Sequence, residues 1–189
     1  MGPSVQAETT AKPLKLHIGC GKVYLPGFVH VDLRPLPHVD VVTAADQLGM
    51  FGDGSADLIY NCHIVEHIGR HKEDAVLREW YRVLRPGGVL RTATPDFEQV
   101  AKWYLETGDL DVLMGLLYGG QTYDENSHGQ IFDFKRLETK LLAVGFRTVC
   151  RYDWRTTEHA AVDDFSQAYL PHMDKGHGTL MSLNVESVK

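Results

Sequence analysis

The feature that most constrains the fold is a glycine turn between two short apolar runs near the start of the chain. Residues 14–21 read Leu-Lys-Leu-His-Ile-Gly-Cys-Gly, and residues 28–33 read Phe-Val-His-Val-Asp-Leu. The alternation of apolar and polar residues before Gly19 predicts a short strand that runs into a tight turn. Because glycine has no Cβ, Gly19 and Gly21 can adopt positive φ and let a ligand approach the backbone closely. The pattern predicts a ligand at the carboxyl end of a parallel strand.

The spacing of the acid after this turn indicates which ligand fits. Asp32 ends the second run, where its carboxylate could accept hydrogen bonds from both hydroxyls of a ribose. A dinucleotide site has a third glycine that opens a helix, and its acid follows about 20 residues on. Here Tyr24 stands at the third position, Asp32 comes much sooner, and Pro26 leaves room for about one helical turn. The spacing favours a ligand with a ribose and no phosphate cradle, which describes S-adenosylmethionine better than NAD.

A simpler interpretation of the same residues is a structural turn in which Asp32 caps the end of a strand. The two interpretations differ in what replacement of Asp32 should do. If Asp32 binds a ribose, alanine should weaken cofactor binding and leave folding stability nearly unchanged. If Asp32 only caps the turn, stability should fall and affinity should hardly move.

The composition fits one globular domain. The chain has 189 residues, of which 43% are hydrophobic and 23% charged, and this length can bury an adequate core. We expect residues 1–12 to be a flexible leader and residues 13–189 to form a single domain. The formal net charge of -6 disfavours nucleic acid as a partner.

The cysteines and apolar runs bear on the compartment. Cys20, Cys62 and Cys150 lie far apart and form no Cys-x-x-Cys pair, so neither a disulfide framework nor a thiolate zinc site is indicated. No apolar run approaches the roughly 18 residues of a membrane span. These features favour a cytoplasmic location and leave the oligomeric state open.

Strand and helix patterns alternate along the chain. Besides the first two strands, we expect strands within 39–42, 57–60, 89–94, 146–154 and 179–188. Amphipathic spacing predicts helices over 72–84, 97–107, 110–117 and 133–145. This alternation predicts an α/β fold, a three-layer sandwich that binds ligands at the carboxyl ends of its strands.

Residues 63–68, His-Ile-Val-Glu-His-Ile, have two faces if they are helical. His63, Glu66 and His67 then lie together, and each could act as a general base, although such histidines more often have structural roles. The same residues match His-x-x-Glu-His, the inverted zinc-peptidase motif. A glycine-turn sheet is a poor context for that family, so we expect no metal, and a zinc hydrolase is the less favoured alternative.

The polar segment 119–129 is long for a connection in a compact domain. Loops of this length are usually functional or disordered, so we interpret it as a candidate lid. It carries Tyr123, which fits a packing or substrate-wall role, and His128, a further candidate catalytic residue.

Several segments together resemble the class I S-adenosylmethionine-dependent methyltransferases, in particular the small type-11-like group. They are Leu16-His-Ile-Gly-Cys-Gly21, Val29-His-Val-Asp32, Ala45-Asp46, Ser55-Ala-Asp-Leu-Ile-Tyr-Asn61 followed by His63-Ile-Val-Glu-His67, and Glu79-Trp-Tyr-Arg-Val-Leu-Arg-Pro-Gly-Gly88. The last segment is the most specific. His17 departs from the pattern, because the family often has an acid there. The resemblance implies a Rossmann-like, seven-stranded, mostly parallel sheet in the order 3-2-1-4-5-7-6.

The resemblance also implies the cofactor and its contacts. The cofactor is S-adenosyl-L-methionine, and a methyl group passes to an unidentified acceptor, which we expect to be a small molecule. Family roles place the methionine part on backbone at 19–21 and at Asn61, the ribose on Asp32, and the adenine near residues 46 and 47. The expected cofactor-binding residues are Gly19, Cys20, Gly21, Asp32, Leu33, Asp46, Gln47, Asn61 and His63. A non-catalytic cofactor-binding or partner subunit is the alternative.

Overall fold

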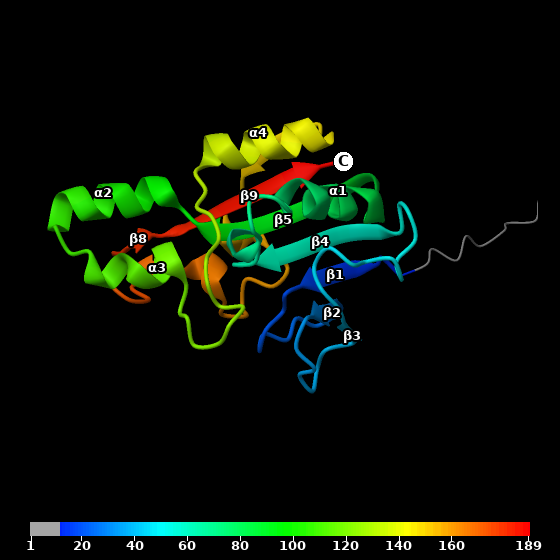
Figure 1. Ribbon diagram of the computed structural model, residues 1–189, viewed down its shortest axis with the longest axis horizontal. Helices are drawn as coiled ribbons and strands as arrows, with labels where there is room; N and C mark the ends of the chain where they lie inside the picture. Colours follow the sequence, from blue (N-terminus) through cyan, green and yellow to red (C-terminus); the bar gives the residue numbers. More distant parts are fainter. Residues whose placement is uncertain (1–11) are drawn as a thin grey trace, which may run out of the picture.

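Seven strands form the central sheet of the computed structural model, which describes residues 12–189 (Figure 1). The flexible leader expected over residues 1–12 lies outside the described residues, except for Lys12. The strands of this sheet are β1 (Lys15–Ile18), β2 (Val29–Asp32), β3 (Val41–Val42), β4 (Ala56–Cys62), β5 (Leu84–Pro95), β6 (Thr148–Arg151) and β9 (Ser182–Val188).

The strand order is β3-β2-β1-β4-β5-β9-β6, with β9 antiparallel to both neighbours and the other pairs parallel. Because β9 is the last strand in the chain, this order confirms the predicted Rossmann-like α/β sheet. The order reverses beside β1, where β2 leads to one edge and β4 to the other. Open α/β sheets bind ligands in the crevice at such a switch point, outside the carboxyl ends of the strands. The fold therefore directs attention to the ends of β1, β2 and β4.

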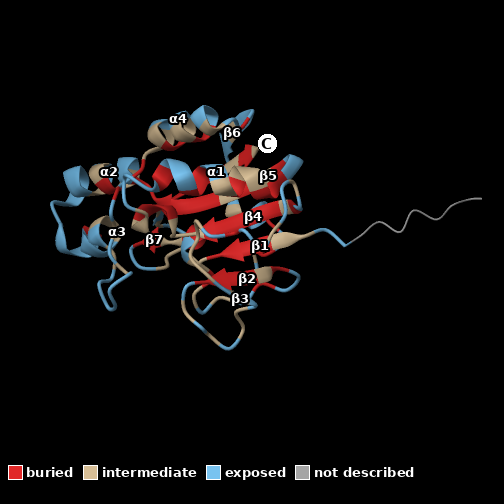
Figure 2. Cartoon of the chain, turned by 45° about the vertical axis from the view of Figure 1, so that its right-hand side comes forward, coloured by how far each residue is buried: buried red, intermediate tan, exposed pale blue. Residues whose placement is uncertain are grey.

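Helices α1 (Glu73–Val83) and α4 (Phe134–Val144) cover one face of the sheet (Figures 1 and 2). The residues that α1 buries recur at helical spacing and form one stripe: Val76, Leu77, Trp80 and Val83. The indole N–H of Trp80 donates to the carbonyl of Ala45 at 2.8 Å, so this buried donor is paired. This bond also holds the segment that follows β3 against the helix.

Loops and short turns cover the opposite face. They include η3 (Trp154–Thr156) and η4 (Phe165–Gln167), and the Asp164 carboxylate accepts a 2.6 Å hydrogen bond from the Tyr60 hydroxyl of β4. Right-handed crossovers bring the β1–β2 and β2–β3 connections to this face, and both are too short to contain a helix. Within the described chain, the third layer of the predicted sandwich is thus built from loops. Its apolar core is Leu25, Phe28, Leu58 and Tyr60.

A smaller unit extends beyond the carboxyl ends of the strands (Figure 1). It contains α2 (Phe97–Thr107), η2 (Asp111–Leu113), α3 (Met114–Tyr118), β7 (Tyr169–Leu170) and β8 (Thr179–Leu180). Its own apolar cluster consists of Val100, Leu113, Leu170 and Met181. None of the helices in residues 12–189 is long and apolar enough to cross a membrane.

The structure differs from the prediction of a two-faced helix over 63–68. His63 has φ +53°, and its N–H donates to the Ala93 carbonyl at 2.8 Å, so its backbone continues the pairing of β4 with β5. A single 3-10 turn, η1 (Val65–His67), follows. The helix expected over 110–117 is likewise divided into η2 and α3.

Candidate functional site

The glycine turn lies at the carboxyl end of β1 and requires both of its glycines. Gly19 has φ +66° and Gly21 has φ +54°, which side chains with a Cβ rarely adopt. The Gly19 N–H donates to the Val31 carbonyl at 2.7 Å and ties the turn to β2. A Cβ at position 19 would lie 2.1 Å from Cδ1 of Ile64, so the loop after β4 packs directly on this glycine. Three strand ends therefore meet at the turn.

Asp32, at the end of β2, holds the turn in place. Its Oδ2 accepts a 2.7 Å hydrogen bond from the Gly21 N–H, and its Oδ1 accepts from the backbone N–H of Arg34 at 2.9 Å. The side chain of Arg34 also contacts Oδ1, with its Nε at 3.3 Å. Asp32 is thus a structural cap. The structure therefore changes the expectation for alanine at this position: stability should fall, because the N–H of Gly21 would lose its partner.

The structural role of Asp32 leaves room for a ligand. Each carboxylate oxygen has two acceptor sites, so neither oxygen is saturated by the backbone bonds. The Nε of Arg34 makes the longest of the contacts, and a ribose hydroxyl could replace it. Structural and ligand-binding roles therefore coexist at this carboxylate.

Asn61 adjoins the glycine turn from the other side. It is paired with Ile18 in the parallel register of β1 and β4, which brings its backbone next to Gly19. Its side chain is buried and donates from Nδ2 to the Thr92 hydroxyl at 3.0 Å, while its Oδ1 has no hydrogen-bond partner. The segments expected to hold the methionine part of the cofactor thus lie side by side.

The residues expected near the adenine follow β2 and β3. Leu33 is 52% exposed and offers an apolar surface beside Asp32. The N–H of Thr43 donates to the Asp32 carbonyl at 2.9 Å, so the segment that leads to Asp46 and Gln47 begins next to Asp32. That Leu33, Asp46 and Gln47 meet around an adenine stays a prediction.

Cys20 contributes through its backbone. Burial, followed by the nearby Asp32 carboxylate, raises the pKa of the Cys20 thiol to about 12. The thiol therefore stays protonated at neutral pH and is a poor nucleophile. Its N–H donates to the Val31 carbonyl at 3.3 Å, which supports the turn.

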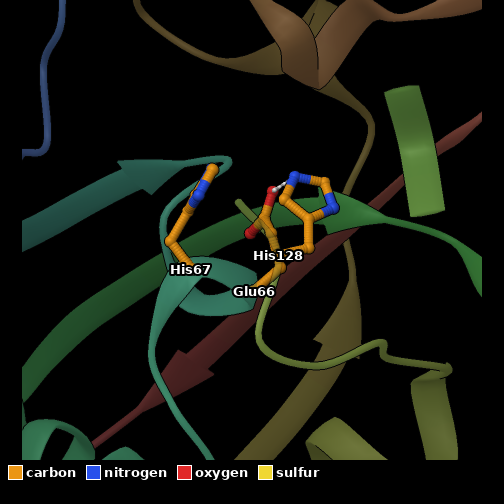
Figure 3. Close-up of side chains that lie close together, drawn as sticks. All are labelled: Glu66, His67 and His128. Carbon is orange, nitrogen blue, oxygen red and sulfur yellow. Dashed lines mark ion pairs between the residues drawn. The ribbon is translucent and has the colours of Figure 1, made fainter. Parts of the chain in front are cut away.

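A second group of predicted residues gathers around Glu66, which we call the Glu66 cluster: His63, Glu66, His67 and His128. Figure 3 shows three of them, with His67 and His128 approaching Glu66 from η1 and from the loop before α4. Oε1 of Glu66 lies 3.2 Å from Nδ1 of His63 and 4.0 Å from Nε2 of His128. The structure thus brings together all four candidate catalytic residues, although 63–68 is not a helix.

Burial governs the protonation of the Glu66 cluster. Burial raises the pKa of Glu66 to about 8. It lowers the pKa of His63 to about 3, and burial together with the neighbouring His67 lowers that of His128 to about 4. Imidazoles with such low pKa values are neutral at pH 7 but weak bases. The general-base role predicted for His63 and His128 is therefore disfavoured.

Sequence reasoning missed three residues at this site. Thr94 donates its hydroxyl to Oε2 of Glu66 at 3.0 Å, Arg34 lies against Asp32, and Ile64 packs on Gly19. The position of Arg34 two residues after an acid at a strand end is a signal that could have indicated it. The other two contacts depend on tertiary packing and have no local signature.

The segment 119–129 reaches both parts of the site. The guanidinium of Arg34 lies over the ring of Tyr123, 4.6 Å from its centroid. At the other end, the N–H of Gly129 donates to the Glu66 carbonyl at 2.8 Å. The candidate lid therefore spans from the Asp32 side to the Glu66 cluster.

Comparisons with known proteins agree with this geometry. A family model described as a methyltransferase domain matches residues 24–92, and no curated protein matches the chain. A SAM dependent methyltransferase from Archaeoglobus fulgidus is 14% identical, with a TM-score of 0.58 over 94% of this chain and 86% of that chain.

Two further solved structures show the same fold. The 1,6-didemethyltoxoflavin-N1-methyltransferase of Burkholderia thailandensis, with bound 1,6-didemethyltoxoflavin and S-adenosylhomocysteine, is 15% identical, with a TM-score of 0.58 over 94% of this chain and 72% of that chain. A SAM-dependent methyltransferase from Thermotoga maritima is 16% identical, with a TM-score of 0.56 over 96% of this chain and 84% of that chain.

The two kinds of comparison cover different parts of the molecule. The structures are similar over nearly the whole chain and establish the fold, whereas the family match runs from the residues just after the glycine turn into β5 and includes Asp32, Asn61 and Glu66. The chain has the fold of the class I methyltransferases, and residues 24–92 match the methyltransferase-domain family model.

Proposed function

We propose that this chain transfers a methyl group from S-adenosylmethionine to a small-molecule acceptor. The observation that carries the proposal is the junction at the ends of β1, β2 and β4. At this junction the glycine turn, Asp32 and Asn61 lie next to one another, and the strand order is that of the methyltransferase fold. The turn offers backbone to the methionine part, and Asp32 offers free acceptor sites to the ribose.

S-adenosylmethionine supplies an electrophilic methyl group whose leaving group is a neutral thioether. The chain therefore has to align the acceptor and exclude water. The Glu66 cluster lies next to the glycine turn, because Ile64 packs on Gly19 and Glu66 follows within the same loop. Segment 119–129 joins both parts and would close over them. In this arrangement Glu66, His67 and His128 face the acceptor rather than the adenosine.

The acceptor is proposed to be small. The net charge of -6 disfavours a polyanion such as nucleic acid. The Burkholderia protein of the same fold was solved with a small heterocycle bound, which supports this class of acceptor without identifying it. A cytoplasmic location is part of the proposal, because the free thiols of Cys20, Cys62 and Cys150 suit a reducing compartment.

Calorimetric titration with S-adenosylhomocysteine, with NAD as control, tests the cofactor. We expect S-adenosylhomocysteine to bind and to raise the melting temperature, and NAD to do neither. Binding of NAD in place of S-adenosylhomocysteine would contradict the proposal. A screen of amine, hydroxyl and thiol acceptors, with S-adenosylhomocysteine formation as readout, then tests turnover. Binding without turnover on any class would favour the non-catalytic subunit.

The zinc-peptidase alternative loses its structural basis. That motif places two histidines one turn apart on a helix. His63 has a positive φ and precedes the single turn that carries His67, so no common helix presents both rings. We therefore do not propose a hydrolase.

A further inference from the structure

Three potential metal ligands converge at the carboxyl edge of the sheet. One carboxylate oxygen of Glu66 and one ring nitrogen each of His67 and His128 all lie within 4.8 Å of one another (Figure 3). Ligands bound to one Zn²⁺ at about 2.0–2.2 Å lie about 3–4 Å apart. Small side-chain rotations would therefore bring all three to a single ion.

Both imidazoles are oriented as metal ligands usually are. Nδ1 of His67 lies 3.1 Å from the Ser127 carbonyl, and Nδ1 of His128 lies 3.1 Å from the Leu116 carbonyl. A carbonyl oxygen can only accept, so each Nδ1 carries the proton and each Nε2 keeps its lone pair. Metal-binding histidines typically donate their second N–H to a carbonyl or a carboxylate in this way.

Glu66 provides the observation that calls for a cation. It is 1% exposed, and its Oε2 accepts from the Thr94 hydroxyl, whereas its buried Oε1 makes no hydrogen bond, although Nδ1 of His63 lies 3.2 Å away. A buried polar oxygen without a hydrogen bond is costly, and an ion bound to the deprotonated carboxylate would remove that cost. Oε1 is also the oxygen that faces Nε2 of His128.

We propose that Glu66, His67 and His128 bind a divalent transition-metal ion, Zn²⁺ or a neighbour of it, that holds an oxygen of the methyl acceptor. Two imidazoles and one carboxylate suit Zn²⁺, Fe²⁺ or Ni²⁺, whereas Mg²⁺ and Ca²⁺ prefer oxygen ligands alone. Three protein ligands leave coordination positions open, as in catalytic sites. Sequence analysis predicted no metal, because a glycine-turn sheet is a poor context for the zinc-peptidase motif that His63 and His67 match. The structure puts His128 in the place of His63.

The role toward the acceptor rests on the proposed function. A hydroxyl bound to the ion would lose its proton to water more readily. The oxygen lone pair then forms the new O–C bond while the S–C bond of the cofactor breaks, and its electron pair stays on sulfur.

The metal site is tested without any methyl transfer. Chelator-treated protein is titrated with Zn²⁺ in competition with a chromophoric chelator, and elemental analysis measures the bound zinc. We expect about one Zn²⁺ per chain, and a loss of affinity of about tenfold or more in His67→Gln, His128→Gln and Glu66→Gln. His177→Gln is the matched control, because His177 is an exposed histidine outside the cluster, and it should bind as wild type does.

A conservative variant guards against loss of fold. Thr94→Val keeps the shape of the side chain and removes its hydrogen bond to Glu66, so zinc affinity should fall about tenfold or more while the melting temperature of the zinc-free protein shows that it is folded. No zinc binding by wild type, or equal affinity in wild type and all cluster variants, would overturn the site.

Co²⁺ serves as a spectroscopic probe that tests the role toward the acceptor separately from metal binding. Co²⁺ bound to wild type should give visible absorption bands that acetohydroxamate, an oxygen-donor probe, shifts. Bands that acetohydroxamate leaves unchanged would mean a closed, structural site and would overturn the acceptor role. S-adenosylhomocysteine affinity should stay within about threefold in the cluster variants. Zinc binding without S-adenosylhomocysteine binding would refute the proposed function and leave the metal site standing.

Discussion

The described part of the chain holds two groups of neighbouring histidines that differ in their surroundings. The face histidines lie under the loops that cover one side of the sheet, and they are His17, His30, His38 and His159. The edge histidines lie at the carboxyl ends of the strands, and they are His63, His67 and His128. Both groups are close-packed, so proximity of imidazoles alone does not distinguish a site from a core.

One of the face histidines, His30, completes hydrogen bonds of the fold. His30 accepts the Leu25 N–H on Nε2 at 2.9 Å, and its Nδ1 lies 3.2 Å from the Asp40 carboxylate. Aromatic rings also pack on these histidines: the Tyr24 ring stacks on His30 with centroids 4.8 Å apart, and the Tyr60 ring lies tilted against His159 with centroids 4.4 Å apart. The sequence places His17 where the family often has an acid, but its ring points toward Tyr60 on this face and does not face the glycine turn.

The edge histidines instead surround an incomplete group. The buried Oε1 of Glu66 has no hydrogen-bond partner. Backbone carbonyls accept from Nδ1 of His67 and of His128, which leaves Nε2 of each ring without a proton and free to bind a ligand. The buried Nδ1 atoms of His17 and His159 also lack hydrogen-bond partners, so an unpaired polar atom alone does not mark a ligand site. The two regions differ in position, because the edge histidines lie at the strand ends beside the glycine turn and the face histidines lie under loops. Variants in each region test this distinction.

The largest effect is expected at Asp32, which stabilises the glycine turn and is also proposed to bind the ribose. Asp32→Ala removes two hydrogen bonds from ribose to a charged group, each contributing roughly 1.5–3 kcal/mol. Affinity for S-adenosylhomocysteine should fall more than about a hundredfold by calorimetry. Stability should also fall, by about 1–3 kcal/mol, because the Gly21 N–H loses its acceptor. Asp32→Asn should lie between wild type and alanine, because one carbonyl oxygen remains.

Asp40→Ala is the matched control. Its carboxylate also accepts a backbone N–H, that of His30 at 2.7 Å, but it belongs to the group that serves the fold. Urea unfolding should show reduced stability, and calorimetry should give wild-type affinity. Equal affinity of the Asp32 and Asp40 variants would mean that the ribose is held elsewhere.

His30→Ala should give the next largest effect. It removes a buried side chain and leaves the Leu25 N–H without an acceptor, so stability should fall by about 2–4 kcal/mol in urea unfolding. Affinity for S-adenosylhomocysteine should stay within about threefold. His177→Ala, at an exposed position, should change neither quantity. If His30→Ala weakened S-adenosylhomocysteine binding much more than Asp40→Ala does, the distinction between the face histidines and the edge histidines would not hold.

The face histidines should also make stability depend on pH. Burial, then the neighbouring His30, His159 and His38, lowers the pKa of His17 to about 3. Below its unfolded pKa of about 6.5 the unfolded chain binds a proton that the folded chain does not, so stability falls as pH falls, by about 1.4 kcal/mol per pH unit. The loss continues down to the folded pKa.

His17→Leu tests this directly. Nδ1 of His17 has no hydrogen-bond partner, so leucine removes a titration without breaking a bond at that atom. Urea unfolding at pH 7, 6 and 5 measures the free energy of unfolding. Its slope against pH should be smaller in the variant than in wild type, by about 1.4 kcal/mol per pH unit at the lower pH values. An unchanged slope would show that His17 is protonated in the folded state.

Local patterns in the sequence predicted the strands and the glycine turn, because these depend on short-range features, whereas the sheet order was implied by the family resemblance. Positive φ at Gly19 and Gly21, the caps at Asp96 and Asp133, and the strand alternation are encoded within a few residues. The helical spacing over 63–68 gave a wrong prediction, because strand pairing at His63 overrides helical periodicity.

The Glu66 cluster could not be assembled in the same way. His128 reaches it from a loop far along the chain, held by the Leu116 carbonyl and by the Gly129 N–H on the Glu66 carbonyl. Its arrival depends on how that loop folds over the strand ends, for which the sequence has no periodic signal. The same applies to Thr94, whose hydroxyl reaches Glu66 across neighbouring strand ends.

The smallest expected effect concerns the proposed lid. Tyr123 is 43% exposed and contacts Arg34 through a cation–π interaction, which at exposed sites contributes about 0.5–1 kcal/mol. Because this contact links segment 119–129 to the residue that lies against Asp32, its loss should let bound S-adenosylhomocysteine escape faster. Tyr123→Ala should therefore raise the dissociation rate about two- to fivefold in stopped-flow measurements and change unfolding stability by less than about 1 kcal/mol. Tyr123→Phe keeps the ring and should match wild type.

Hydrogen exchange over 119–129 should slow on ligand binding in wild type and the phenylalanine variant, and less so in the alanine variant. Equal dissociation rates in all three, with exchange unaffected by ligand, would show that the segment is a fixed wall of the site.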